Sequence, residues 1–320
     1  MLDTIELPGT GRRTTRLGFG GSGLMGGMSE RESLRLLETA FDAGIRHFDV
    51  APSYGHGLAE RCLGKFLRGK AGQVTVATKY GILPPQRAGL LGAARNVFRP
   101  VARQLPAVRK RLAQAAAGLK SRARFSAEEA TRSLENSLRE LAIERVDLWL
   151  LHEAMADDLD DSDLLPWLEK SRQQGRIGTF GVGTERSHLN ALWQRHRDYC
   201  GVLQFEHSVV DPAPNFPGAF YIHHRAISGA VAALRESFAL DLQLCRRWSS
   251  AVDADLDQSE VLAVLLLRAA MSSNSNGIVL FSSRTSAHIQ DDVRIANDPA
   301  WAARSQRFLK LFEGQPARCH

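Results

Sequence analysis

The feature that most constrains the fold of this chain is a regular alternation of short apolar runs with longer amphipathic stretches. Eight runs rich in β-branched and aromatic residues lie at about residues 16–20, 46–51, 74–79, 146–152, 177–183, 202–208, 220–227 and 277–282. Helical patterns lie between them, near 30–43, 58–69, 126–141, 162–174, 186–195, 229–239 and 257–272, with one or two more near 286–312. Parallel strands joined by crossover helices give this pattern. The sequence therefore predicts an α/β fold, a (β/α)8 TIM barrel.

Two of the predicted helices begin with a recognisable cap. Ser29 is followed by Glu32, and Ser126 by Glu129, a spacing in which the Ser and Glu side chains satisfy each other's backbone N–H groups. Ahead of the first strand, the segment IELPGTGRR contains a Gly-Thr-Gly turn at residues 9–11. This segment predicts an N-terminal β-hairpin that plugs the bottom of the barrel.

No linker divides the sequence, so we expect a single domain over residues 1–320. With 44% hydrophobic and 24% charged residues, the chain can bury a large core. No apolar run reaches the roughly 18 residues needed to span a bilayer, and residues 1–17 lack the apolar segment of a signal peptide. We therefore expect a cytoplasmic protein without a membrane span. The four cysteines show no spacing typical of a disulfide framework or a zinc site.

The positive charge of the chain is concentrated in one segment. Residues 81–127 contain ten Lys and Arg residues and no Asp or Glu, and the whole chain has a net charge of +6, so the rest has a net charge of −4. This distribution weighs against nucleic acid as a partner. Apolar residues at helical spacing predict a basic helical insert after the third strand, at about residues 82–125. A solvated surface, attachment to an anionic membrane and a lid that attracts an anionic substrate all fit this insert.

A glycine motif follows the first predicted strand. Gly18, Gly20 and Gly23 match the GxGxxG spacing of a dinucleotide-binding fingerprint. That fingerprint requires the last glycine to lead directly into a helix, whereas here LMGGM intervenes before the helix predicted at 30–43. The motif therefore indicates a loop in which the backbone approaches a ligand closely.

Four chemically active side chains follow successive predicted strands. Asp49 lies in the second strand and Tyr54 in the loop after it, while Lys79 ends the third strand and His152 the fourth. In a barrel the C-terminal ends of the strands meet at one mouth, so these side chains are expected to face a common space. A buried carboxylate needs a partner, and Lys79 can provide it. Each residue alone has a structural explanation, but the four together indicate a catalytic site.

On these residues the sequence resembles the aldo-keto reductase family. The family's signature is matched by the segment GIRHFDVA at residues 44–51 and by Tyr54, Gly55, Glu60 and Gly64, and its catalytic Lys and His by Lys79 and His152. The resemblance implies an NAD(P)H-dependent oxidoreductase that interconverts the carbonyl of an aldehyde, ketone or sugar-like compound and its alcohol. The implied partner is a small-molecule carbonyl or alcohol substrate.

The roles of the four side chains follow from that chemistry. Tyr54 is the acid in reduction and the base in oxidation. The Lys79 cation is expected to lower the pKa of Tyr54, and Asp49 to hold the cation in place. His152 is expected to orient the carbonyl oxygen and to stabilise the charge that develops on it.

The resemblance also assigns Gly183, Thr184, Gln204 and Ser228 to the nicotinamide end of the cofactor, and the backbone of Gly20 and Gly21 is expected to line the cofactor as well. Gln204 stands where the family holds the nicotinamide amide, and Gly183 with Thr184 replaces the usual Ser-Asn pair. Ser228 closes the segment that should supply a ring to stack on the nicotinamide. That segment, residues 223–228, has no Tyr, Phe or Trp, so His224 is the candidate ring.

A second set is assigned to the phosphate end of the cofactor: Ser282, Ser283, Arg284, His288 and Asp292. Ser282 stands where many family members have Lys, His288 where many have Arg, and Asp292 where Asn is usual. Ser283 and Arg284 remain as anion contacts ahead of a predicted helix start. We expect NADP(H) rather than NAD(H) as the cofactor.

Two functions of other classes compete with the oxidoreductase. The first is a regulatory subunit that binds a nicotinamide cofactor with little turnover. The second is a metal-dependent barrel hydrolase, which usually carries an HxH ligand pair on a strand; this sequence has no such pair, and we expect no metal. Turnover of NADPH with a panel of aldehydes separates the first alternative from the enzyme.

Overall fold

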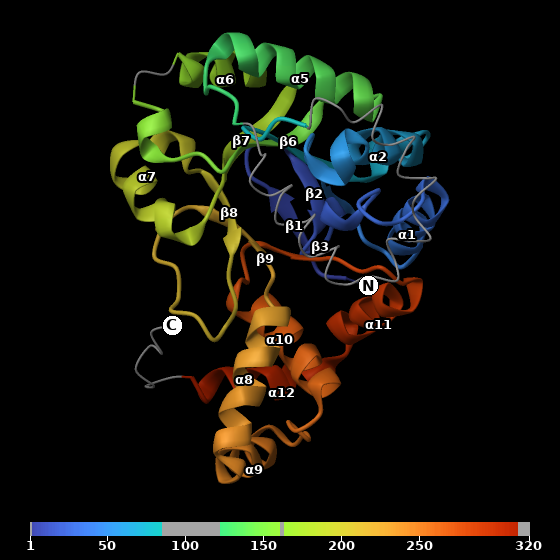
Figure 1. The fold of residues 1–320 in the computed structure, drawn as a ribbon, viewed down its shortest axis with the longest axis vertical. Helices are drawn as coiled ribbons and strands as arrows, with labels where there is room; N and C mark the ends of the chain where they lie inside the picture. Colours follow the sequence, from blue (N-terminus) through green and yellow to red (C-terminus); the bar gives the residue numbers. More distant parts are fainter. Residues whose placement is uncertain (1, 85–121, 161–162, 313–320) are drawn as a thin grey trace, which may run out of the picture.

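The computed structural model describes residues 2–84, 122–160 and 163–312. Its main sheet contains the strands β3 (Leu17–Gly20), β4 (His47–Asp49), β5 (Thr75–Tyr80), β6 (Val146–His152), β7 (Ile177–Gly183), β8 (Val202–Glu206), β9 (Phe220–His224) and β10 (Ile278–Phe281). These parallel strands close into a barrel in the order β10-β3-β4-β5-β6-β7-β8-β9 (Figure 1). Each strand coincides with a predicted apolar run, so the predicted (β/α)8 barrel is confirmed.

The described helices surround and extend this barrel. They are α1 (Glu30–Asp42), α2 (Ala59–Leu67), α5 (Ala127–Leu141), α6 (Leu164–Gln173), α7 (Leu189–Arg195), α8 (Ser228–Leu240), α9 (Leu242–Val252), α10 (Ser259–Ser273), α11 (Ser286–Asn297) and α12 (Pro299–Lys310). The sequence reading missed α9. Its start is capped by the Asp241 side chain, which accepts from the Leu244 N–H at 2.8 Å, and its buried face is Cys245, Trp248 and Val252. That spacing is a helical signal.

The two predicted capping boxes differ in outcome. At α1 both halves are present: Ser29 Oγ accepts from the Glu32 N–H at 3.3 Å, and the Glu32 carboxylate accepts from the Ser29 N–H at 2.6 Å. At α5, Ser126 Oγ accepts from the Glu129 N–H at 3.4 Å. The Glu129 carboxylate instead accepts from the Arg124 N–H at 2.9 Å. The predicted bond from the Ser126 N–H to Glu129 was therefore wrong.

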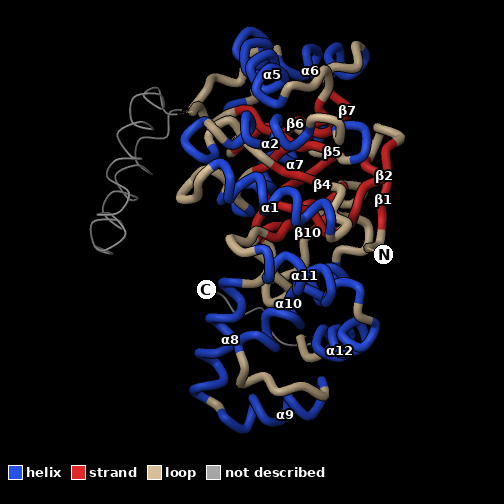
Figure 2. Tube along the Cα trace, turned by 90° about the vertical axis from the view of Figure 1, so that its right-hand side faces the viewer, coloured by secondary structure: helices blue, strands red, loops and turns tan. Residues whose placement is uncertain are grey.

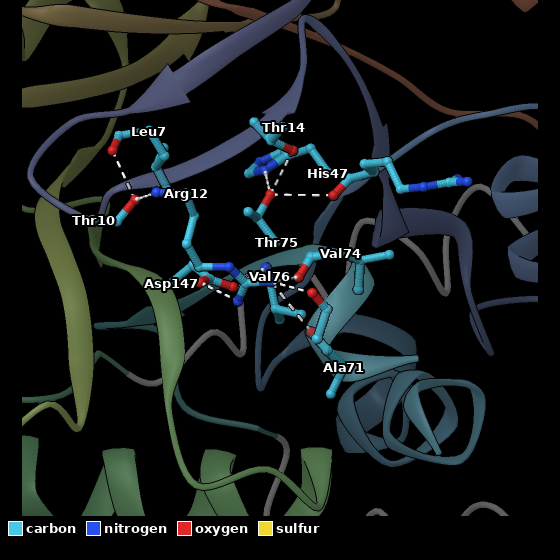
Figure 3. Close-up of polar contacts among 12 residues, drawn as sticks. Leu7, Thr10, Arg12, Thr14, His47, Ala71, Val74, Thr75, Val76 and Asp147 are labelled. Carbon is cyan, nitrogen blue, oxygen red and sulfur yellow. Dashed lines mark hydrogen bonds and ion pairs between the residues drawn. The ribbon is translucent and has the colours of Figure 1, made fainter. Parts of the chain in front are cut away.

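The predicted hairpin is present at the N-terminal end of the barrel strands. Strands β1 (Thr4–Leu7) and β2 (Arg12–Thr15) pair antiparallel, and Leu7 is fully buried in the cluster of apolar side chains that includes Leu148 and Ile222 from the barrel strands. Figure 3 shows how polar contacts anchor it. Arg12 pairs with Asp147 at 2.7 Å, and Thr75 Oγ1 donates to Thr14 Oγ1 at 2.7 Å. The hairpin therefore closes the bottom of the barrel, as predicted.

A second apolar core lies outside the barrel. Helices α8, α9, α10 and α12 gather on one side of it, and Figures 1 and 2 show them projecting away from the strands. Leu234, Trp248, Leu266 and Phe308 are among the side chains buried between them. Helices α8, α9 and α10 of the crossover from β9 to β10, together with α12 after β10, thus form a helical assembly with its own interior.

Candidate active site

The structure brings together the four residues predicted to be catalytic. Asp49 ends β4, Lys79 lies near the end of β5, His152 ends β6, and Tyr54 begins the short 3-10 segment after β4. Lys79 Nζ lies 2.5 Å from Asp49 Oδ1 and 5.2 Å from the centre of the Tyr54 ring. The rings of Tyr54 and His152 meet edge to face with their centres 6.0 Å apart. The four side chains therefore share one space at the C-terminal ends of neighbouring strands.

Gly55 explains how the chain presents Tyr54. It has φ 58°, in the left-handed region, and His56 after it has φ 59°. A Cβ at Gly55 would lie 2.4 Å from the Leu24 carbonyl oxygen and 2.6 Å from the Met25 Cβ, so no other residue fits. The loop after β3 is thus packed directly against the loop that carries Tyr54.

Burial dominates the electrostatics of Tyr54. Burial raises its pKa above the usual 10.0; the Lys79 cation, which also hydrogen-bonds the tyrosine, opposes this, and the Asp49 carboxylate adds to it. Lys79 does lower the pKa of Tyr54, as expected, but burial raises this pKa by more. For Lys79, burial alone would lower the pKa, yet the charges of Asp49 and Tyr54 raise it above the usual 10.5. At neutral pH, Tyr54 is therefore a neutral phenol beside an ammonium ion.

Gln204 contributes a contact that the sequence did not predict. Its Nε2 donates to Asp49 Oδ2 at 2.8 Å, and both side chains are buried. A Cβ at Gly183 would lie 3.3 Å from Gln204 Oε1, so the glycine leaves room for this amide. Thr184, next to it, is buried and donates its hydroxyl to the Ala154 carbonyl oxygen at 3.0 Å.

Gly20 and Gly21 lie at the same end of the barrel. A Cβ at Gly20 would lie 2.8 Å from Ser282 Oγ, which donates to the Gly20 carbonyl oxygen, and one at Gly21 would lie 2.9 Å from the Asp49 carbonyl oxygen. The glycine motif continues as a 3-10 turn at Gly21–Gly23, and α1 begins only at Glu30. At Gly21 the close approach that requires glycine is to the protein's own backbone.

The residues assigned to the phosphate end gather at the start of α11. Ser283 Oγ accepts from the Thr285 N–H at 3.2 Å, and Thr285 caps α11 by accepting from the His288 N–H at 3.4 Å. Arg284 is exposed at this helix start. Burial raises the pKa of Asp292 to about 6, with His288 acting in the opposite direction. Ser228 is apart from this group, as the first residue of α8.

Histidines line the neighbouring strand end. His224, the candidate ring, is half-buried at the end of β9, and burial lowers its pKa to about 4, with Asp49 raising it and Lys79 lowering it. On the other face of β9, the ring centres of His223 and His207 lie 4.5 Å apart, and Arg186 donates to His207 Nδ1 at 2.8 Å. The sequence did not predict this histidine pair, whose members come from β9 and from the residue directly after its neighbour β8.

The two ends of the basic insert lie close to the candidate site. Residues 85–121 lie outside the described residues, and with them the predicted helices and lid. Ile82 and Arg122 form an antiparallel bridge, so the segment leaves and returns at one place. Arg122 pairs with Asp158 and donates to the Glu153 carbonyl oxygen at 2.8 Å, next to His152.

Other sites and membrane spans were sought among the described residues. Within them, no group of three or more His, Cys, Asp or Glu side chains could hold a metal ion. None of the helices in this part of the chain has both the length and the apolar character to cross a membrane. Cys62, Cys200 and Cys245 are buried free thiols, and Cys319 lies outside the described residues.

The comparisons with known proteins agree on one family. The sequence model of the Aldo/keto reductase family matches residues 16–215. D-threo-aldose 1-dehydrogenase of Pseudomonas sp is 32% identical over 178 residues, which cover 52% of this chain and 49% of that protein. Pyridoxal 4-dehydrogenase of Microbacterium luteolum is 30% identical over 224 residues, covering 63% of this chain and 61% of that protein. The chain thus spans about half to three fifths of the length of these relatives.

Solved structures show the same fold over nearly the whole chain. An aldo-keto reductase of Bacillus halodurans in its holo form gives a TM-score of 0.68 at 19% identity, covering 96% of each chain. An aldo-keto reductase of Klebsiella pneumoniae in complex with NADPH gives 0.60 at 17% identity, covering 93% of this chain and 90% of that one.

Proposed function

This chain belongs to the aldo/keto reductase family, and from that premise we propose that it is a nicotinamide-dependent oxidoreductase that interconverts a carbonyl and its alcohol. The observation that carries the proposal is the buried ion pair of Asp49 and Lys79, at 2.5 Å, whose ammonium hydrogen-bonds Tyr54 at the barrel mouth. The two relatives described above, named as dehydrogenases of an aldose and of pyridoxal, support this class of reaction.

In the proposed reaction Tyr54 transfers the proton. The raised pKa of Tyr54 keeps its hydroxyl protonated at neutral pH, so it can donate to the oxygen of a carbonyl during reduction. Lys79 stabilises the tyrosinate that remains, and Asp49 fixes the ammonium. His152, edge to face with Tyr54, orients the substrate oxygen. A bound nicotinamide supplies or accepts the hydride.

The residues around Asp49 and α11 suit such a cofactor. Gln204, whose side chain contacts Asp49, offers an amide for the carboxamide, and Thr184, directly after β7, offers a hydroxyl. At the other end, Ser283 and the exposed Arg284 stand at the start of α11, where the N–H groups and dipole of a helix favour anions. The NADPH complex of the Klebsiella pneumoniae reductase supports the phosphorylated form as cofactor.

We predict a modest preference for NADPH over NADH that depends on Arg284. Parallel titrations of protein fluorescence with the two cofactors measure it, and Arg284→Ala should remove most of it, because the guanidinium is the positive charge at that helix start. Tighter binding of NADH by the native protein would contradict the proposal and would indicate that Ser282 and His288 determine cofactor choice.

The decisive test of the function is Tyr54→Phe. The variant should lower kcat roughly 100-fold or more with little change in cofactor affinity, because general acid catalysis typically contributes that much. Tyr221→Phe is the matched control, since the Tyr221 hydroxyl bonds the backbone of Phe216. Near-normal turnover by Tyr54→Phe would contradict the mechanism. Cofactor binding without turnover of any aldehyde, ketone or sugar would favour the regulatory subunit.

A further inference from the structure

The Gln204 side chain reaches across the barrel to Asp49. In the strand order, β8 and β4 are separated by three strands in one direction and three in the other, so they face each other across the interior. Gln204 Nε2 lies 2.8 Å from Asp49 Oδ2, while Lys79 Nζ lies 2.5 Å from Oδ1. The Asp49 carboxylate is therefore held at both oxygens, and rotation about its Cβ–Cγ bond would break one contact or the other.

The same contacts determine where the Lys79 ammonium lies. Its Nζ donates to Asp49 Oδ1 and to the Val50 carbonyl oxygen at 3.1 Å, and it faces the Tyr54 ring at 5.2 Å from the centre. Since the Val50 carbonyl is fixed backbone, the carboxylate is the movable anchor of the ammonium. Gln204, Asp49, Lys79 and Tyr54 thus form one continuous chain of contacts.

We propose that Gln204 is a positioning residue for proton transfer, because its hydrogen bond to Asp49 fixes the Asp49–Lys79 pair against Tyr54. The inference rests on the proposed function, in which Tyr54 carries the proton. This positioning role is separate from any contact between Gln204 and the cofactor, because the bond to Asp49 is formed in the protein alone.

Other ionisable groups also face this chain of contacts. The charge of Glu153 raises the pKa of Tyr54, and the His152 ring lies edge to face with it. His47 and His224 face the Asp49–Lys79 pair, and burial lowers the pKa of each to about 4. Both rings are therefore neutral in the alkaline range in which Tyr54 ionises, and neither contributes a titration step in that range.

The test is Gln204→Met, which keeps the length of the side chain and removes the N–H donor. Tyrosinate absorbance is titrated in the cofactor-free protein, and the same titration with Tyr54→Phe added isolates the Tyr54 contribution. The Tyr54 pKa should rise by less than the roughly one unit that a hydrogen bond contributes to its own charged acceptor, because the effect reaches Tyr54 through Asp49 and Lys79. The alkaline limb of kcat for alcohol oxidation should move by the same amount.

Two further variants make the test specific. In Gly183→Ala the new Cβ would lie 3.3 Å from Gln204 Oε1, so the amide must move slightly although no group is removed, and the variant should give a smaller shift in the same direction. This variant decides the matter if Gln204→Met does not fold. Thr184→Val removes a neighbouring hydroxyl that does not touch Asp49, and it should change cofactor affinity while the Tyr54 titration stays in place.

The outcomes separate this inference from the proposed function. If Gln204→Met weakens cofactor binding but moves neither the titration nor the pH profile, Gln204 serves the cofactor alone and the inference is overturned. If Tyr54→Phe keeps full turnover while Gln204→Met still shifts the Tyr54 titration, the proposed function fails and the positioning of Lys79 by Gln204 stands.

Discussion

At the scale of single residues, burial decides how the candidate site behaves. The Lys79 side chain is 2% exposed and Asp49 is 4% exposed, so each is the main compensation for the charge of the other. Around Tyr54 burial raises the pKa more than the cation lowers it, which favours the protonated phenol. At neutral pH Tyr54 therefore keeps its proton, as the proposed reduction requires.

We predict that Lys79→Met lowers the free energy of unfolding by about 3 kcal/mol or more, because it leaves the Asp49 carboxylate buried without its cation. Urea unfolding at neutral pH measures this. The double variant Lys79→Met/Asp49→Leu should recover much of the loss, since no charge then remains to be compensated. Equal instability of the single and double variants would show that packing, and not charge, holds this part of the barrel together.

The sequence could predict which residues meet at the site but not all of their bonds. Asp49, Tyr54, Lys79 and His152 follow consecutive strands, and the fold itself carries consecutive strand ends to one mouth. The bond from Gln204 to Asp49 joins strands on opposite sides of the barrel, and its formation depends on side-chain lengths across the interior. His223 comes from β9 and His207 from directly after its neighbour β8, and no local pattern in the sequence marks them as a pair.

At the scale of elements, the contact between α2 and α5 depends on Gly64. Its backbone packs so closely that a Cβ would lie 2.4 Å from the Glu140 carbonyl oxygen and 2.8 Å from the Leu141 carbonyl carbon. In a free helix, alanine would be favoured over glycine by about 1 kcal/mol. Here the neighbours are backbone atoms of another helix, so glycine is the residue that permits the approach.

We predict that Gly64→Ala destabilises the protein by about 1–3 kcal/mol, the usual range for overpacking, despite the gain in helix propensity. Gly72→Ala is the matched control, since a Cβ at that position meets no atom within 4 Å, and its stability should stay close to that of the native protein. Thermal unfolding of both variants gives the comparison. A more stable Gly64→Ala would mean that α2 and α5 can separate without loss.

Element boundaries were predictable where a local signal determined them. The Ser29 cap and its reciprocal Glu32 bond depend on four consecutive residues, and both formed. The Glu129 carboxylate had a competing donor, the Arg124 N–H, outside the motif, and it bonded there. Helix α9 carried an Asp241 cap and a periodic apolar face, so the sequence did contain its signal.

At the scale of the whole molecule, buried histidines link stability to pH. Burial lowers the pKa of His47 and of His207 to about 4, and that of His223 to about 3, from 6.5. The folded state keeps these rings neutral, while the unfolded chain binds protons near 6.5. Stability from this source is therefore complete above pH 6.5 and is lost as the pH falls toward 4.

We predict that the free energy of unfolding falls steeply between pH 6.5 and 4, and that His223→Phe makes the fall shallower. The His223 ring is 2% exposed, stacks on Tyr221, and has no hydrogen-bond partner for either nitrogen among the described residues, so phenylalanine can replace it. Urea unfolding at pH 7 and pH 5 compares the variants. His188→Phe, at a less buried ring, is the control for replacing a histidine by phenylalanine.

The seam at which β10 pairs with β3 has a consequence for how the protein is made. It joins Val279 to Leu17 and Phe281 to Phe19, so this edge of β3 stays unpaired until β10 has been made and has left the ribosome. At about 5–20 residues per second, that edge is open to other chains for many seconds during synthesis. Each newly made molecule thus passes through a stage in which β3 has an unpaired edge that another chain can reach, and this stage ends when β10 pairs with it.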